Sequence, residues 1–314
     1  IGFILANLLK GKKNKNLLHV TNKYENLEKL EKEINFYFPE ANVLLFPEWD
    51  TLPYDISSPS KNLQSERMKT LYNLINNKKE FTIVITTVNS IIQKVISKTS
   101  FNKISIKLNK DDKINIEELK KSLIDCSFRD VNVAISPGEF SINNNTLDII
   151  TSVEDSYRIK FSDKIEKIKK FNSITQLTTG NELDSIDIIP SSEVILNKEN
   201  MLTFKSNYRK LFTKFKNEIY ENVSNSIMPI GIENLLPLFY SNPLDNILNY
   251  LDETFFITLG ISDEDLNFTF DLIDKYYKER KSISETIDKD LLYSNKEKLI
   301  DLINNFKVIK INNN

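Results

Sequence analysis

The chain has very little of the residue types on which many active sites depend: its 314 residues include one cysteine, one histidine and six glycines. The single cysteine, Cys126, excludes an internal disulfide and suits a reducing compartment. The single histidine, His19, has no second histidine or nearby cysteine with which to hold a metal ion. We therefore expect Cys126 to be a small core residue and His19 a packed or half-exposed strand residue, and we predict no metal site.

The scarcity of glycine also argues against nucleotide binding. A phosphate-binding loop consists of Gly, four further residues, and then Gly-Lys followed by Ser or Thr. Gly11-Lys12 is the only Gly-Lys pair, and it has Ala6 in place of the first glycine and Lys13 in place of the hydroxyl residue. The acidic pair Asp252-Glu253 precedes the strand pattern FFITLG, whereas a magnesium-holding pair would follow a strand. We predict no cofactor, no catalytic residues and no enzymatic activity.

Long apolar runs and an excess of one charge are missing as well. No run approaches the roughly 20 apolar residues that a membrane-spanning helix needs, and no signal peptide is visible. We therefore predict a cytoplasmic protein without a membrane partner. The formal net charge of −2 provides no overall basic field for DNA. Because the chain begins IGFILANLL, without Met, it is compatible with a piece of a longer polypeptide.

The first hundred residues alternate between strand and helix patterns. The predicted strands are 17–20, 43–46 and 81–86, and the helical patterns that follow them are 22–38, about 68–75 and 89–96. Asn22 and Glu25 are predicted to form a capping box at the start of the first helix. Strands separated by helices of this length indicate a parallel sheet that is covered on both faces.

From about residue 191 helical patterns dominate, including the Tyr- and Phe-rich segment 204–223. The remaining predicted elements are a strand at 255–260, a long helix near 266–281, a last helix and a strand at 308–311. Ser294 and Glu297 are predicted to cap the last helix.

Residues 106–189 have a different pattern of secondary structure. A helix at 116–123 is followed by short alternating strands, predicted at 131–136, 146–150, 157–161 and near residue 168. In the third of them, alternation places Tyr157, Ile159 and Phe161 on one face and Arg158 with Lys160 on the other. We predict a small α+β domain at 106–189, inserted into an α/β domain made of residues 1–105 and 190–314.

A lysine-rich hairpin is predicted at residues 158–170. Its charged residues are Arg158, Lys160, Lys164, Lys167, Lys169 and Lys170 against Asp163 and Glu166, a local excess of four positive charges. Such a run is commonly a solvated face. It can also be a contact surface for an acidic partner, either a protein or DNA phosphate.

Several segments, in the same order along the chain, resemble the bacterial transcription-repair coupling factors (Mfd). They are FPEWDTLPYD with SERMKTLYNL, GEFSINNNTLDII, YRIKFSDKIEKIKKFN, IDIIPSSEVIL and MPIGIENLLPLFYSNPLDNILNYL. The chain resembles the excision-repair protein UvrB more distantly. UvrB has a long hairpin where this chain has only about ten residues between Asp55 and Glu66, and UvrB keeps the phosphate loop that is missing here.

The resemblance implies a degenerate, helicase-like parallel-sheet domain that lacks the nucleotide site and carries the inserted α+β domain. Such an amino-terminal, UvrB-like module has no catalytic activity. It recruits UvrA to stalled transcription complexes in nucleotide excision repair, and it restrains the motor located elsewhere in the polypeptide. The implied partners are UvrA and the remaining domains of the same protein, with weak or no DNA contact.

The resemblance also implies a UvrA-binding site made of Arg158, Asn143, Phe161 and Ser162. The arginine of the family's Tyr-Arg strand matches Arg158, whereas a second family arginine falls on Asn143 and a second phenylalanine on Ser162. A neutral amide cannot reproduce a bidentate guanidinium contact. We expect Arg158 to face outward and to gain little from local ion pairs.

Two other interpretations remain open on the sequence. The chain could be a DNA-binding remnant that uses hairpin 158–170, or a truncated UvrB-like repair protein. DNA binding would fall steeply as salt increases, because counterions are released when phosphates are neutralised. Docking of a protein partner would be less sensitive to salt.

Overall fold

The computed structural model describes residues 1–12, 15–76, 79–212 and 217–311. Within these residues, no helix is both long enough and apolar enough to cross a membrane. The chain divides into two compact units. The first contains residues 1–57, 70–98 and 242–314, and the second contains residues 58–69 and 99–241. Helix α3 (Lys61–Asn76) has residues in both units.

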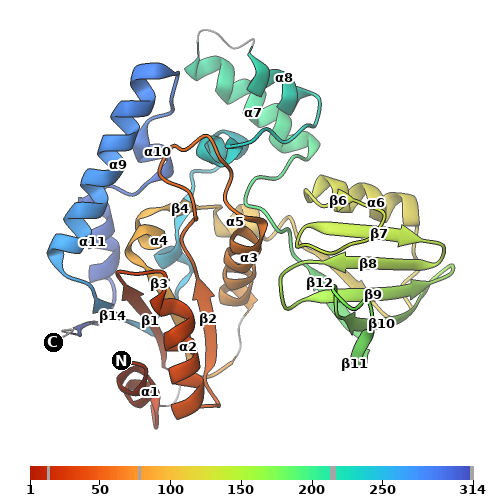
Figure 1. Cartoon of the computed structure of the whole chain (residues 1–314), viewed down its shortest axis with the longest axis horizontal. Coiled ribbons are helices and arrows are strands. Elements are labelled where there is room, and N and C mark those ends of the chain that lie inside the picture. Colours follow the sequence, from red (N-terminus) through yellow and green to blue (C-terminus); the bar gives the residue numbers. More distant parts are fainter. Residues whose placement is uncertain (13–14, 77–78, 213–216, 312–314) are drawn as a thin grey trace. The chain divides into compact units, whose positions relative to one another are not determined.

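A five-stranded sheet forms the centre of the first unit (Figure 1). Its strands, in spatial order, are β15 (Val308–Lys310), β14 (Phe255–Gly260), β1 (Asn16–Thr21), β3 (Thr82–Thr87) and β2 (Asn42–Phe46). Every pair of neighbours is parallel. The parallel sheet predicted from the alternating strand and helix patterns is therefore confirmed.

Both faces of this sheet are shielded from solvent. All six residues of β3 are buried, and successive residues of a strand point to opposite faces. On one face, strand residues such as Leu17 and Ile83 pack in a single cluster with apolar residues of helices α1 (Gly2–Leu9) and α2 (Asn26–Tyr37). His19 lies in β1 and is fully buried, as a packed strand residue.

The predicted helix at 89–96 is wrong in its second half. Helix α4 spans only Val88–Ile92, and the chain then enters β4 (Lys94–Val95), which pairs with β13 (Asp245–Asn246). The hydrogen bonds of this distant pairing replace those that would extend the helix. The other helices of the first unit are the 3-10 helix η2 (Ile247–Tyr250), α9 (Asp263–Ile283), α10 (Lys289–Leu292) and α11 (Lys296–Asn304).

Both predicted helix caps are also wrong. Helix α2 starts at Asn26, after a turn at Lys23, and no side chain caps it. Helix α11 is capped by Asn295, whose side chain accepts a hydrogen bond from the backbone N–H of Lys298. Ser294 is instead used in tertiary packing, since its hydroxyl accepts a hydrogen bond from the buried Asn246 amide.

The second unit is built around a six-stranded sheet. Its strands, in spatial order, are β11 (Thr178–Leu183), β10 (Ile165–Phe171), β9 (Ser156–Phe161), β8 (Thr146–Ile150), β7 (Glu139–Asn143) and β6 (Arg129–Asp130). Helix α6 (Ile116–Asp125) contributes Leu119 and Leu123 to the hydrophobic core on one face of this sheet. The other elements of the second unit are α5 (Lys98–Phe101), β5 (Ile106–Asn109), β12 (Ser185–Ile188), α7 (Lys198–Leu211), α8 (Glu218–Ser224) and the 3-10 helix η1 (Ile232–Phe239).

One strand of this unit was predicted in the wrong place. Residues 131–136 form a loop, and the sequence patterns missed the strand β7 that follows. The backbone N–H groups of Ile135 and Ser136 donate to the carboxylate of Glu139, at 3.0 Å each, and not to a neighbouring strand. The Glu139 carboxylate therefore fixes the conformation of the loop, and Glu139 is also the first residue of β7.

A buried polar network joins three segments of the second unit that are distant in sequence. The Arg67 guanidinium donates to Glu193 at 2.7 Å, and the hydroxyl of Tyr240 donates to the backbone carbonyl of the same glutamate. Gln64 donates to the carboxylate of Glu233 at 3.0 Å. These residues lie in three of the segments on which the family resemblance rests: SERMKTLYNL with its preceding residue, IDIIPSSEVIL and GIENLLPLFY. The motifs therefore include residues that hold the second unit together.

Candidate partner-binding site

One face of the six-stranded sheet lies opposite the core cluster that contains α6 residues, and it carries charged and polar side chains beside a small buried cluster of Ala134, Ile150 and Phe171. We call this side of the sheet the outer face. The strand register places two rows of side chains across it, because directly opposed residues of antiparallel strands point to the same side. The first row is Ser141, Asp148, Arg158, Lys169 and Glu182, and the second row is Asn143, Thr146, Lys160 and Lys167. The predicted site residues Arg158 and Asn143 therefore share a face.

Arg158 is held firmly within this face. Its Nε and one terminal nitrogen donate to the two carboxylate oxygens of Asp148, both at 2.7 Å. Its other terminal nitrogen donates to the backbone carbonyl of Gln176 at 2.9 Å. The guanidinium carbon also lies 5.0 Å from the centre of the Phe171 ring. The Asp148 contact raises the pKa of Arg158, and the side chain is only 22% exposed.

This geometry corrects the expectation that Arg158 gains little from local ion pairs. A bidentate pair with two low-exposure partners differs from a flexible surface pair, because both side chains are already fixed in one geometry. The side chain does point away from the core, as alternation predicts. Its surroundings, however, are a carboxylate and a ring of the same sheet and the side-chain amide of a neighbouring loop, and not only lysines.

The four predicted site residues do not form one cluster. Asn143 is exposed at the end of β7, and its amide donates to the backbone carbonyl of Asn132 at 3.2 Å. Phe161 is 6% exposed and belongs to the hydrophobic core on the opposite face from Arg158. Ser162 is exposed in the turn after β9, where its backbone N–H donates to the Lys164 carbonyl.

Most basic residues of the hairpin are neutralised within the domain. Lys164 pairs with Asp111, Lys167 lies 3.5 Å from Glu182, and Lys170 lies 2.8 Å from Asp155. Among the described residues, no carboxylate pairs with Lys160 or Lys169, both of which lie on the outer face. The positive charge available to a partner is therefore concentrated at these two lysines.

Asp155 anchors the turn between β8 and β9. It lies 2.9 Å from Lys69 of helix α3 and 2.8 Å from Lys170, and it also accepts a hydrogen bond from the hydroxyl of Ser152. Burial alone raises the pKa of Asp155, but the hydrogen bonds and positive charges of Lys170 and Lys69 outweigh burial and lower it to about 2. The turn is thus tied to α3 by a charged cluster.

Away from the outer face, the two side chains best suited to catalysis or metal binding, His19 and Cys126, are buried in the core. Burial lowers the pKa of His19 to about 4, and burial raises the pKa of Cys126 to about 11. In the described part of the chain, no group of three or more His, Cys, Asp or Glu residues is placed to hold a metal ion. Gly11-Lys12 follows helix α1 and precedes β1, whereas a phosphate loop follows a strand. Lys13 lies outside the described residues.

Sequence reasoning missed the residues that hold Arg158. Asp148 could have been found, because alternation in TLDII puts it on the polar side of a strand next to the Tyr-Arg strand. No pattern in the sequence indicated that Gln176 would contact Arg158. Gln176 lies in a loop with a positive φ of 59°, and its side-chain amide donates to the backbone carbonyl of Ala134 at 3.1 Å.

Comparison with known proteins adds an independent line of evidence. Residues 106–194 match the family described as the UvrB interaction domain. The chain is 35% identical over 264 residues to the transcription-repair-coupling factor of Rickettsia conorii, covering 83% of this chain and 23% of that protein. It is 29% identical over 230 residues to that of Escherichia coli, covering 72% of this chain and 20% of that protein. The chain therefore spans less than a quarter of the length of these relatives.

Proposed function

The chain is homologous to a part of the transcription-repair-coupling factors and contains a UvrB interaction domain at residues 106–194, and we propose that it is a non-catalytic module of such a factor that binds UvrA. The observation that carries this proposal is the match to the interaction domain, because the matched residues include the whole outer face of β7–β10. In this role the module brings excision repair to stalled transcription complexes.

The charge of the outer face supports an acidic partner surface. Lys160 and Lys169 supply positive charge, and Asn143 lies in the same row as Lys160. A guanidinium has five N–H donors. Four of those of Arg158 are used by Asp148 and Gln176, which leaves one for a partner. Arg158 therefore acts in our proposal mainly by fixing the face, and the two lysines make the principal charge contacts.

An apolar rim next to Arg158 extends this surface. Two loops meet where the Gln176 amide donates to Ala134, and each presents exposed apolar side chains. Ile174 is 86% exposed and Leu177 is 67% exposed on one side of this contact. Ile135 is 57% exposed on the other. Apolar groups beside charged ones are the usual composition of a protein-binding patch.

The finer assignments implied by the family follow from the same homology. Residues 1–105 and 190–314 would form a degenerate, helicase-like domain without a nucleotide site, and the α+β domain at 106–189 would be inserted between them. The module would work in the cytoplasm. It would also restrain the motor of the full-length factor through contacts outside the outer face.

The structure gives less support to the DNA-binding interpretation of hairpin 158–170. Four of its six basic residues, Arg158, Lys164, Lys167 and Lys170, already pair with carboxylates of the same domain. A face that neutralises DNA phosphates needs positive charges that are free to replace counterions. The two relatives compared above are, moreover, named as transcription-repair-coupling factors.

A binding titration with purified UvrA from the same source tests the proposal. The double variant Lys160→Glu/Lys169→Glu is expected to weaken binding at least tenfold, since two attractive charges become repulsive. The matched control is Lys121→Glu, an exposed lysine of α6 on the core side of the domain, which should bind as the unmodified chain does.

Two results would overturn the proposal. One is the absence of UvrA binding by the unmodified, folded chain. The other is a double variant that binds UvrA normally, which would move the site away from the outer face. Binding to duplex DNA that falls steeply with salt, without UvrA binding, would favour the DNA-binding interpretation instead.

A further inference from the structure

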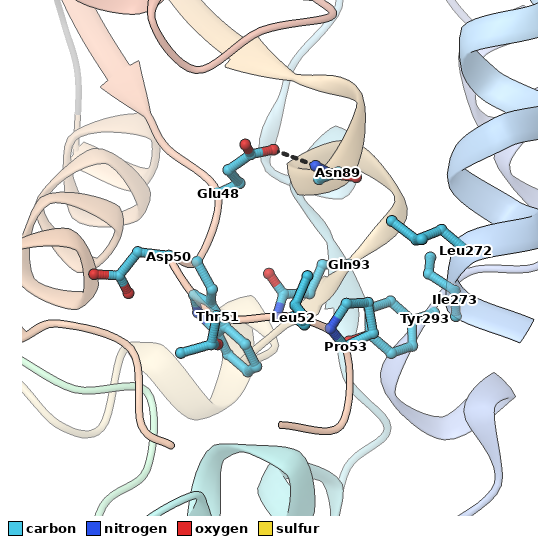
Figure 2. A pocket seen from close by; sticks show the side chains of 11 residues that line it. Glu48, Asp50, Thr51, Leu52, Pro53, Asn89, Gln93, Leu272, Ile273 and Tyr293 are labelled. Carbon is cyan, nitrogen blue, oxygen red and sulfur yellow. Dashed lines mark hydrogen bonds between the residues drawn. The ribbon is translucent and has the colours of Figure 1, made fainter. Parts of the chain in front are cut away.

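A pocket of about 300 Å³ lies in the first unit, at the carboxyl ends of strands β2 and β3 (Figure 2). Glu48 and Trp49 follow β2, Asn89 and Gln93 lie at α4, and Leu272 and Tyr293 close the opposite side from α9 and the segment after α10. Parallel α/β sheets bind ligands at this edge, because side chains from neighbouring connections converge there. The pocket contains none of the residues of the outer face.

Glu48 is held in a fixed orientation at one end of the pocket. Its Oε2 accepts hydrogen bonds from the Thr87 hydroxyl at 2.9 Å and from the Asn89 side-chain amide, and Figure 2 shows the second of these bonds. No described residue donates to its Oε1. The pocket thus contains a preorganised carboxylate oxygen with an open acceptor site.

Gln93 is the second unusual feature. It is only 4% exposed, yet its side-chain amide has no hydrogen-bond partner among the described residues. The amide atoms are not sealed in the core but open onto the pocket, where a ligand can supply the hydrogen bonds that the chain does not. Figure 2 shows the Gln93 side chain among the residues that line the pocket. The backbone N–H of Gln93 donates to the carbonyl of Asn89, so the two residues are one helical turn apart. Residues at this spacing lie on the same side of a helix, which brings the Gln93 side chain close to Asn89, the residue that donates to Glu48.

The other lining residues select the kind of ligand. Glu48 and Asp50 are acidic, and the lining contains no lysine or arginine. A phosphate group would therefore be repelled. Trp49 and Tyr293 offer aromatic rings, and Leu52 with Leu272 offers apolar contact for an aliphatic stem. A flat cation on an apolar stem satisfies all of these features.

We propose that this pocket binds the arginine side chain of a partner protein. A guanidinium is planar and has donors along several edges, so it can donate to Glu48 Oε1 and to the Gln93 carbonyl oxygen together. It can also stack on an aromatic ring while its methylene stem lies on leucine side chains. The pocket is then a second protein-contact site, independent of the UvrA-binding proposal.

The test uses blocked amino acids as probes and the 314-residue chain. Nα-acetyl-arginine amide is titrated by heteronuclear NMR and is expected to bind saturably, shifting the signals of Trp49 and Gln93. Nα-acetyl-citrulline amide has nearly the same shape but no charge, and it should bind at least tenfold more weakly. The lysine analogue should fall between them, because it lacks the planar donor fork.

Variants complete the test. Glu48→Gln is expected to weaken arginine binding at least tenfold, whereas Glu28→Gln, an exposed carboxylate of α2, should leave it unchanged. Gln93→Met should weaken it several-fold. If Glu48→Gln lowers the melting temperature, the comparison of arginine with citrulline on the unmodified chain still decides. Equal affinity for arginine and citrulline, no saturable binding, or preferred binding of adenosine would each overturn the proposal.

Discussion

The guanidinium of Arg67 donates to the carboxylate of Glu193 at 2.7 Å, and the two side chains are 0% and 1% exposed. The residues are 126 positions apart in the sequence, so this contact fastens the first part of α3 to the segment that leaves the matched interaction domain. Burying an ion pair costs desolvation free energy, so an intact pair adds little net stability. Losing one partner, by contrast, leaves a buried charge uncompensated and destabilises the fold strongly.

Loss of one partner of this pair is expected to destabilise the second unit strongly. Arg67→Met should cost about 3–5 kcal/mol, because Glu193 is left as a buried and uncompensated charge. Urea denaturation measures the change in the free energy of unfolding. The double variant Arg67→Met/Glu193→Leu should recover much of the loss. If the double variant is as unstable as the sum of the single variants, the pair is not the cause.

Arg158→Ala is expected to affect both stability and partner binding. Asp148, whose side chain is only 12% exposed, would lose its bidentate partner, and a cost of about 1–3 kcal/mol follows. UvrA binding should also weaken, because Arg158 no longer holds Asp148 and the Gln176 loop in place on the outer face. Thermal unfolding and the UvrA titration are measured on the same sample. An unchanged melting temperature would show that the Asp148 pair contributes little.

Phe161→Ala is expected to destabilise the second unit by about 3–5 kcal/mol, because the ring fills space in the core next to Ile159 and Ile168. Phe161→Leu should cost much less, since it keeps most of the volume. Circular dichroism during denaturation measures both. If a well-folded Phe161→Leu chain fails to bind UvrA, Phe161 has a direct role in binding.

Asp155 should make the second unit acid-sensitive. Its pKa in the folded chain is about 2, below the usual 3.8. A depressed pKa adds stability that is complete above the unfolded-state value and is lost as pH falls from about 4 towards 2. The contribution is about 2 kcal/mol. Asp155→Asn should remove this part of the pH dependence in unfolding experiments between pH 2 and 5. An unchanged pH profile would contradict the pKa shift.

Addition of Mg-ATP is expected to leave the melting temperature of the chain unchanged. Gly11-Lys12 lies between α1 and β1 and so on the wrong side of a strand to hold phosphates. Ligands that bind only the folded state raise its melting temperature by mass action. A clear, concentration-dependent shift with Mg-ATP, absent with Mg²⁺ alone, would reveal a nucleotide site that neither the motif search nor the fold indicated.

Local sequence patterns predicted the regular elements well where one periodicity was strong. The buried β3 segment, the β9 alternation of Phe161 against Arg158, and the long helix α9 all follow from the spacing of apolar residues. The patterns failed at 93–96, at 131–136, at Asn22 and at Ser294. At 93–96, 131–136 and Ser294, backbone or side-chain groups form hydrogen bonds with residues outside the predicted element. At Asn22, a turn that starts at Lys23 precedes the helix.

The sequence by itself thus determined the parallel α/β sheet, the hairpin of the interaction domain and the face on which Arg158 lies, because a strand's side chains alternate whatever surrounds it. Only the tertiary structure decided what Arg158 contacts and that Glu48, Gln93 and Leu272 share a pocket. Hydrogen bonds and ion pairs act over a few ångströms. Residues that are far apart in the sequence reach that range only when strand register and helix packing have fixed their positions.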